Sequence, residues 1–167
     1  GKDKIKFESN FSNYLNVKYC LGVANGTDAL EIAIKSLKLK KGTEIIVPAN
    51  TWISTAEAVI NNNLKVKFVD VDETHNICIK DLKKKISKKT KALMLVHALG
   101  NCANMNEINK ICKKNKLILI EDTCEALGSK FNNKYLGSFG DFSSFSFYYS
   151  HHITSGEGGM VCAKETK

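Results

Sequence analysis

The chain has 167 residues, of which 43% are hydrophobic and 25% charged, and its formal net charge is +8 at pH 7. This is the composition of a soluble globular domain, and the length suffices for one sizeable core. No apolar run reaches the roughly 18 residues of a membrane span, and the first ten residues do not resemble a signal peptide, so we expect no membrane partner. The chain opens without Met and ends soon after a strand-like stretch, so we expect it to be a piece of a longer protein.

Apolar, β-rich segments alternate with amphipathic helical segments along the chain. The expected strands are residues 19–24, 44–48, 66–71, 91–99, 116–122, 142–148 and 158–163. The expected helices are residues 27–39, 53–63, 79–86 and 104–115. This alternation predicts an α/β fold, a mostly parallel sheet covered by helices on both faces. The last two strands follow one another without a long helix, which suggests a hairpin-like or irregular return.

The cysteines and lysines each admit two interpretations. Six cysteines occur without any CxxC pair, which favours reduced thiols in a cytoplasmic protein and no metal site. The lysine-rich run at 80–91 is either an anionic-partner patch or the solvated side of a surface helix, with Leu82 and Ile86 facing inward. Because the run lacks arginine and aromatic residues, we favour the surface helix and expect no nucleic-acid partner.

Ligands of parallel sheets collect beyond the carboxyl ends of the strands, which directs attention to the loops there. Thr27 and Asp28 begin a helix, and its N-terminus either binds a phosphate or is simply capped by one of these two side chains. Trp52 follows a strand end and is either a stacking wall for a planar ligand or a core residue.

Two further strand ends carry ionisable residues. Glu121 and Asp122 end an apolar strand, so at least one carboxylate is desolvated and needs a partner such as a protonated ring nitrogen. Alternatively, Asp122 caps a short turn. Ser146 is followed by His151 and His152 and by a glycine-rich exit. A histidine there is either a general acid or base or a surface polar residue.

These motifs, in this order, resemble the DegT/StrS-type sugar aminotransferases, pyridoxal-phosphate (PLP) enzymes of fold type I, from about Tyr19 to Met160. The resemblance implies that residues 1–167 are an incomplete, cofactor-binding large domain without the C-terminal small domain. It also implies that Thr27, Asp28 and Ser146 bind the cofactor phosphate, that Trp52 stacks on the pyridine ring, and that Asp122 pairs with the ring nitrogen.

One position departs from the aminotransferases. Five residues after the phosphate-binding serine they carry the lysine that binds the cofactor covalently, and here His151 occupies that position. The sugar 3-dehydratase branch of the family shares this replacement, and residues 99–101 and the Glu121–Ser129 loop also resemble that branch. In the aminotransferases a glutamine or histidine often stands where this chain has Glu125, and we assign Glu125 to the cofactor site.

The resemblance implies an enzyme that uses PLP or its pyridoxamine form (PMP) to remove the C3 hydroxyl of a nucleotide-linked 4-keto-6-deoxy sugar, for cell-surface polysaccharide or lipopolysaccharide sugars. His151 would move the proton at the cofactor's exocyclic carbon. Glutamate is a candidate amino donor, and a homodimer is expected. The alternatives are an aminotransferase of the same family, an inactive binding relative that kept the pocket, and a nucleic-acid-binding protein suggested only by the net charge.

Overall fold

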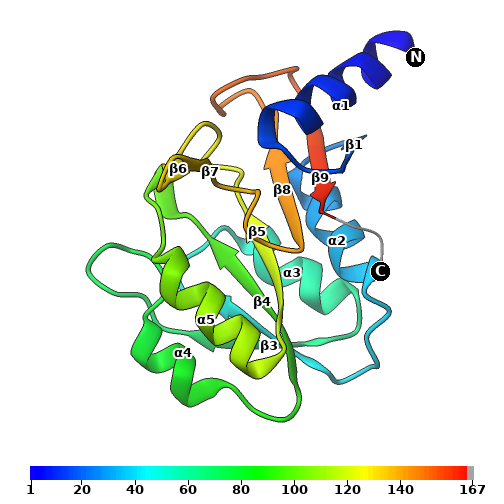
Figure 1. The fold of residues 1–167 in the computed structure, drawn as a ribbon. Helices are drawn as coiled ribbons and strands as arrows, with labels where there is room; N and C mark the ends of the chain where they lie inside the picture. Colours follow the sequence, from blue (N-terminus) through cyan, green and yellow to red (C-terminus); the bar gives the residue numbers. More distant parts are fainter. Residues whose placement is uncertain (165–167) are drawn as a thin grey trace.

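Seven strands form one sheet in the order β1-β9-β8-β5-β4-β2-β3 (Figure 1). The computed structural model describes residues 1–164. The strands of this sheet are β1 (Tyr19–Val23), β2 (Glu44–Pro48), β3 (Lys65–Val69), β4 (Thr90–Val96), β5 (Ile118–Asp122), β8 (Phe142–Ser146) and β9 (Gly159–Ala163). The helices are α1 (Lys2–Leu15), α2 (Gly26–Ser36), α3 (Ile53–Asn61), α4 (Ile79–Lys85) and α5 (Met105–Asn115).

The sheet is parallel except for β9. The β3–β2, β2–β4, β4–β5 and β5–β8 pairs are parallel, whereas β9 runs antiparallel to both of its neighbours, β8 and β1. The expectation of a mostly parallel sheet with a hairpin-like final return is confirmed. Six strands therefore end at one edge, and β9 begins at that same edge.

Helices α2 and α3 pack on one face of the sheet. Their small and branched residues, such as Ala29, Ala33 and Ala58, are fully buried against β2, β4 and β5. Helices α4 and α5 cover the other face, where Leu82, Met105 and Ile108 are completely buried. Because strand side chains alternate between faces, each strand supplies apolar groups to both layers, which explains the continuous apolar runs.

Helix α1 was not predicted from the sequence. Its Phe11 and Leu15, four residues apart, are buried on Phe145 and Phe147 at the far end of the second face. It ends at Asn16, whose left-handed conformation (φ 54°) is typical of a helix C-terminus. The other residues of α1 are mostly polar, so the sequence showed no clear amphipathic pattern from which the helix could be predicted.

Several predicted boundaries were wrong. Helix α2 stops at Ser36 because Leu37 is its C-cap and Lys38 takes a positive φ of 49°. The fourth strand ends at Val96 and passes into a short 3-10 turn, Ala98–Gly100. A small hairpin, β6 (Lys130–Phe131) and β7 (Lys134–Tyr135), was not predicted.

The lysine-rich run is a surface helix followed by a turn, as favoured. Leu82 is fully buried in α4, Ile86 is its partly buried C-cap, and Lys85 bridges to Asp81 at 3.0 Å on the outside. Across residues 1–164, none of the helices combines the length and the apolar character that crossing a bilayer requires.

Candidate functional site

The start of α2 lies against the sheet edge where the parallel strands end. Asn25, not Thr27 or Asp28, caps the helix, since its Oδ1 accepts from the Asp28 N–H at 2.8 Å. The capping interpretation of Thr27 and Asp28 was therefore wrong. Because the Asp28 amide is occupied by the cap, the amides of Gly26 and Thr27 are the ones that the helix end offers to an anion.

Two glycines allow the start of α2 to approach β8 and β9. A Cβ on Gly159 would lie 2.2 Å from the carbonyl oxygen of Asn25, and one on Gly26 would lie 3.0 Å from both Ser146 Cβ and Cys124 Sγ. Larger residues would push the helix away from the sheet. This close approach brings Ser146 beside the helix N-terminus and forms a backbone cradle of the kind that binds phosphate groups.

The start of α3 joins the same region. Trp52 immediately precedes α3 and is 78% exposed, which rules out the core interpretation and leaves an indole free for stacking. Ser54 accepts a 3.0 Å hydrogen bond from the Thr27 hydroxyl, and Thr55 donates a 2.9 Å bond to Asp122 Oδ2. Thr55 was not identified from the sequence, because a threonine inside a helix gives no signal there.

Asp122 ends β5 and is only 7% exposed. Besides the Thr55 bond at Oδ2, its Oδ1 accepts from the Cys124 N–H at 3.3 Å and from the Ser144 hydroxyl at 3.4 Å. The Cys124 contact is the short turn that was considered as an alternative, so Asp122 both caps this turn and remains a buried carboxylate. No basic side chain is among these partners, so a cationic ligand group would complete the site.

His151 follows β8 in an irregular loop and contacts the loop after β5. Its Nδ1 lies 3.3 Å from Glu125 Oε1, and its side chain is 14% exposed against 51% for Glu125. The backbone N–H of His151 donates to the Tyr148 carbonyl at 3.0 Å. His152, by contrast, is exposed. The structure therefore distinguishes the two histidines, and only His151 is held at the edge by a carboxylate.

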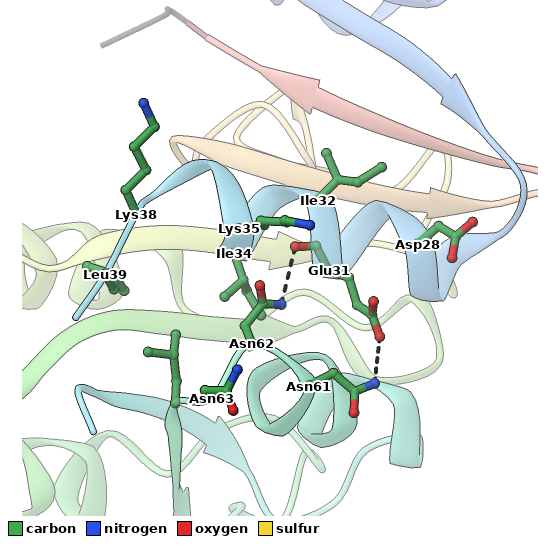
Figure 2. Close-up of a pocket in the computed structure, with 11 residues that line it drawn as sticks. Asp28, Glu31, Ile32, Ile34, Lys35, Lys38, Leu39, Asn61, Asn62 and Asn63 are labelled. Carbon is green, nitrogen blue, oxygen red and sulfur yellow. Dashed lines mark hydrogen bonds between the residues drawn. The ribbon is translucent and has the colours of Figure 1, made fainter. Parts of the chain in front are cut away.

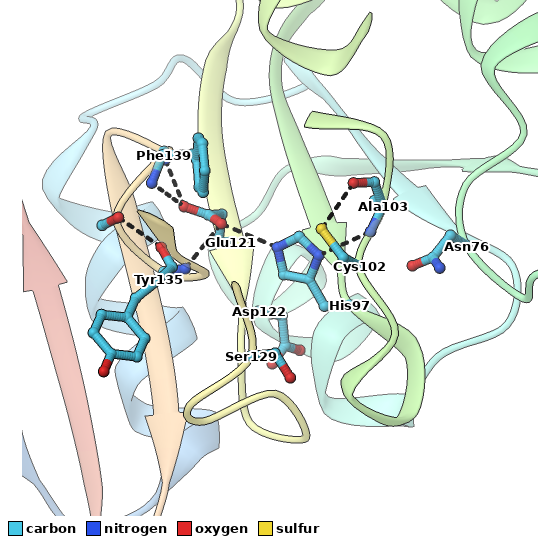
Figure 3. A network of polar contacts seen from close by, with 12 residues as sticks. Asn76, His97, Cys102, Ala103, Glu121, Asp122, Ser129, Tyr135 and Phe139 are labelled. Atoms are coloured by element: carbon cyan, nitrogen blue, oxygen red, sulfur yellow. Dashed lines mark hydrogen bonds and ion pairs between the residues drawn. The ribbon is translucent and has the colours of Figure 1, made fainter. Parts of the chain in front are cut away.

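A second polar cluster lies beneath this edge, on the other face of the sheet (Figure 3). His97 Nε2 is 3.0 Å from Glu121 Oε2, and both side chains are completely buried. Burial by itself raises the pKa of Glu121, but hydrogen bonds from His97 and from the amides of Gly140 and Gly137 outweigh it and hold that pKa below its usual range. His97 was not singled out from the sequence, although a polar residue ending an apolar strand was a usable signal.

A surface groove lies away from this edge. It measures about 480 Å³ and runs between α2 and the end of α3 (Figure 2). Asp28 is the sole residue it shares with the expected site, and Glu31 spans it with hydrogen bonds to Asn61 and Asn62. Its polar groups Glu31, Asn61 and Asn62 are bonded to one another and not left for a ligand. The carboxyl edge remains the candidate site.

All six cysteines are free. Within residues 1–164, no cluster of three or more histidine, cysteine, aspartate or glutamate side chains is arranged to hold a metal ion.

The donor set suits one class of ligand. A helix N-terminus with Ser146 beside it matches a phosphate, an exposed indole matches a planar ring, and a buried carboxylate matches a protonated ring nitrogen. These three features of the edge fit a phosphorylated pyridine such as PLP. The same fold occurs in a solved aminotransferase from Psychrobacter cryohalolentis, which superposes with a TM-score of 0.96 and 34% identity over 99% of this chain and 42% of that one.

The whole chain, residues 1–167, matches the model of the DegT/DnrJ/EryC1/StrS aminotransferase family, and the protein belongs to this family. It is 44% identical to a GDP-4-keto-6-deoxy-D-mannose 3-dehydratase from Escherichia coli O55:H7 over 163 residues, 93% of this chain and 42% of that protein. It is 43% identical to a GDP-perosamine synthase from Escherichia coli O157:H7 over 161 residues, 96% of this chain and 44% of that protein.

Among solved structures, a GDP-4-keto-6-deoxymannose-3-dehydratase with a trapped PLP–glutamate geminal diamine superposes with a TM-score of 0.95. The sequences are 41% identical, and the match covers 99% of this chain and 45% of that one. The chain thus spans less than half the length of these relatives.

Proposed function

We propose that residues 1–167 are the cofactor-binding large domain, without the small domain, of a PLP/PMP-dependent enzyme that acts on a nucleotide-linked 4-keto-6-deoxy sugar. The reaction proposed is 3-dehydration in the biosynthesis of cell-surface polysaccharide sugars. One observation carries it: His151, in contact with Glu125, occupies the loop position five residues after Ser146 where the aminotransferases of the family have their cofactor-binding lysine.

In this proposal the cofactor phosphate lies at the start of α2, against Thr27 and Ser146 and beside Asp28, whose own amide is occupied by the Asn25 cap. The exposed Trp52 indole stacks on the ring, and the Asp122 carboxylate, oriented by the Thr55 hydroxyl, faces the ring nitrogen. A negative charge there keeps the ring nitrogen protonated. When bound, the cofactor supplies an electron sink for a carbon next to its ring.

His151 is the proposed base. Its Nδ1 is engaged by Glu125, which fixes the ring and leaves Nε2 to take a proton at the cofactor's exocyclic carbon. Histidine lacks the primary amine with which lysine binds the cofactor covalently. The proton transfer therefore stays available, while the covalent attachment is lost.

The substrate and partners follow from the relatives. We infer a nucleotide-linked sugar substrate because the related dehydratase and synthase act on or form GDP-linked sugars. The trapped PLP–glutamate adduct in the related dehydratase supports glutamate as amino donor. Free cysteines suit the reducing cytoplasm, where we place the enzyme.

A homodimer is proposed from apolar side chains left exposed at the carboxyl edge, in its loops, its 3-10 turn and the start of α3. They are Trp52, Ile53, Leu99, Tyr149 and Ile153. Exposed apolar groups gathered at one end of a molecule mark an association surface.

The second candidate is an aminotransferase, favoured by the 43% identity to the GDP-perosamine synthase. The two functions differ in whether a lysine binds the cofactor. The full-length protein would be incubated with PLP, treated with borohydride, and scanned for a permanently reduced cofactor absorbance. His151→Lys is the test variant and the neighbouring His152→Lys is the matched control.

We expect wild type and His152→Lys to lose all PLP on dialysis after reduction, whereas His151→Lys retains one PLP per chain. Retention by wild type would mean that another lysine reaches the cofactor, and the aminotransferase would then replace the dehydratase. A tryptic map of the reduced protein would identify that lysine.

A further inference from the structure

Glu121 is the centre of a buried hydrogen-bond cluster. Its Oε1 accepts from the amides of Phe139 and Gly140 at 2.7 and 2.6 Å, and its Oε2 accepts from the Gly137 amide at 2.9 Å and faces His97 Nε2 at 3.0 Å. Four donors around one fully buried carboxylate satisfy the ionised form. The cluster therefore ties the ends of β4 and β5 to the loop that leads into β8 (Figure 3).

The tautomer of His97 follows from its two ring contacts. The Ala103 N–H points to Nδ1 at 3.4 Å, so Nδ1 is the acceptor and Nε2 carries the proton that it donates to Glu121. The His97 ring thus holds the Glu121 carboxylate in place through Nε2.

This cluster is joined directly to Asp122. The backbone N–H of His97 donates to the Asp122 carbonyl at 3.4 Å, and Glu121 precedes Asp122 in β5. Side chains alternate between the faces of a strand, so Glu121 fixes the strand from one side while Asp122 projects on the other. The loop bound by Glu121 also leads into β8, which carries Ser144 and Ser146.

We propose that Glu121 and His97 are positioning residues for the site, setting the orientation of the Asp122 carboxylate and its spacing from the end of β8. The proposal rests on the proposed function in one respect, that Asp122 faces a PLP ring nitrogen. The claim that Glu121 and His97 orient the Asp122 carboxylate does not depend on which ligand binds.

The test uses Glu121→Gln and His97→Gln in the full-length protein. Glutamine at 121 is nearly isosteric but lacks the charge and turns one acceptor into a donor, whereas glutamine at 97 keeps a donor for Glu121. The matched control is Leu82→Ala, which opens a cavity in the same helical layer without touching the strand ends. Three measurements are made on each variant: hydrogen exchange at the Cys124 amide, the PLP dissociation constant, and the ring-nitrogen shift of bound ¹⁵N-labelled PLP.

Exchange at the Cys124 amide reports directly on Asp122, whose Oδ1 accepts from it. We expect Glu121→Gln to speed this exchange about tenfold or more and to weaken PLP binding about 10–100-fold, the range seen for outer-shell partners of metal sites. The ¹⁵N shift should move toward the unprotonated ring. His97→Gln should stay closer to wild type, and Leu82→Ala should change none of the three.

Equal changes in Glu121→Gln and Leu82→Ala would overturn the proposal and reduce the pair to a stabilising contact. A wild type that does not bind PLP would instead refute the proposed function. In that case exchange at the Cys124 amide alone decides whether the pair positions Asp122.

Discussion

The two carboxylates that end β5 have opposite surroundings. Glu121 is enclosed by four protein donors, three of them backbone amides, and is completely buried. Asp122 has three uncharged donors, one of them at 3.4 Å, and lies at the edge where Trp52 and His151 are exposed or partly exposed. The acceptor capacity of Glu121 is filled by short bonds from the protein, whereas the fewer and longer bonds of Asp122 leave its carboxylate able to meet a cationic ligand group.

Removal of Glu121 should cause the largest effect on stability. Glu121→Ala leaves three amides and a histidine without their acceptor, and we expect the free energy of unfolding to fall by about 3–5 kcal/mol, as for a broken buried charge network. Urea denaturation followed by circular dichroism measures this. Glu107→Ala removes the exposed salt bridges of Glu107 to Lys83 and Lys110 and should change stability little. Equal losses of stability in Glu121→Ala and Glu107→Ala would mean that the buried hydrogen bonds of Glu121 do not stabilise the fold more than an exposed salt bridge does.

Asp122→Asn should instead act mainly on function. Asparagine keeps an acceptor for Thr55 but removes the charge that would face the ring nitrogen, so we expect turnover of the full-length enzyme to fall about 10²–10³-fold. Sugar-nucleotide product analysis measures the rate, and the unfolding midpoint should move little. Asp3→Asn on α1 is the control and should leave turnover unchanged. A midpoint that fell as far as in Glu121→Ala would assign Asp122 to the fold.

Thr55→Val tests how much the hydrogen bond to Asp122 contributes to stability. The variant keeps the shape of threonine but deletes the 2.9 Å bond to Asp122 Oδ2, and we expect a loss of about 1–3 kcal/mol in the free energy of unfolding without ligand. Differential scanning calorimetry measures it. Thr43→Val deletes an exposed bond to the Lys40 carbonyl and should cost less. No loss in Thr55→Val would mean that Asp122 does not depend on this hydroxyl.

The smallest effect concerns acid stability. The pKa of Glu121 is lowered in the folded protein, so its ionisation stabilises the fold above the ordinary value of 4.5, and this stabilisation is lost as the pH falls below that value. The stability difference between wild type and Glu121→Gln should therefore shrink as the pH falls below 4.5. Thermal melts across this range test it. A difference independent of pH would mean that Glu121 is not ionised.

Much of the sheet could be predicted from the sequence because its apolar strands are buried on both faces. Trp52 and Asp122 could also be identified as candidate site residues. A large aromatic ring or a carboxylate at the end of an apolar strand is unusual enough to indicate a function. The roles of Thr55 and His97 could not. Each depends on a partner 67 or 24 residues away, and a helical threonine or a lone histidine has the same local pattern whether or not that partner exists.

The antiparallel strand β9 also has a consequence for how the chain folds. Tyr19 at the start of β1 is opposite Ala163 at the end of β9, and β9 is the neighbour of β1 in the sheet, so β1 joins the sheet only after β9 has been synthesised. Pairing two strands so far apart in the sequence closes a long loop, and such closure is slow. The same late strand supplies Gly159, against which the start of α2 is seated. The proposed phosphate site therefore forms only after β9 has joined the sheet. A chain that stops before β9 would lack this site.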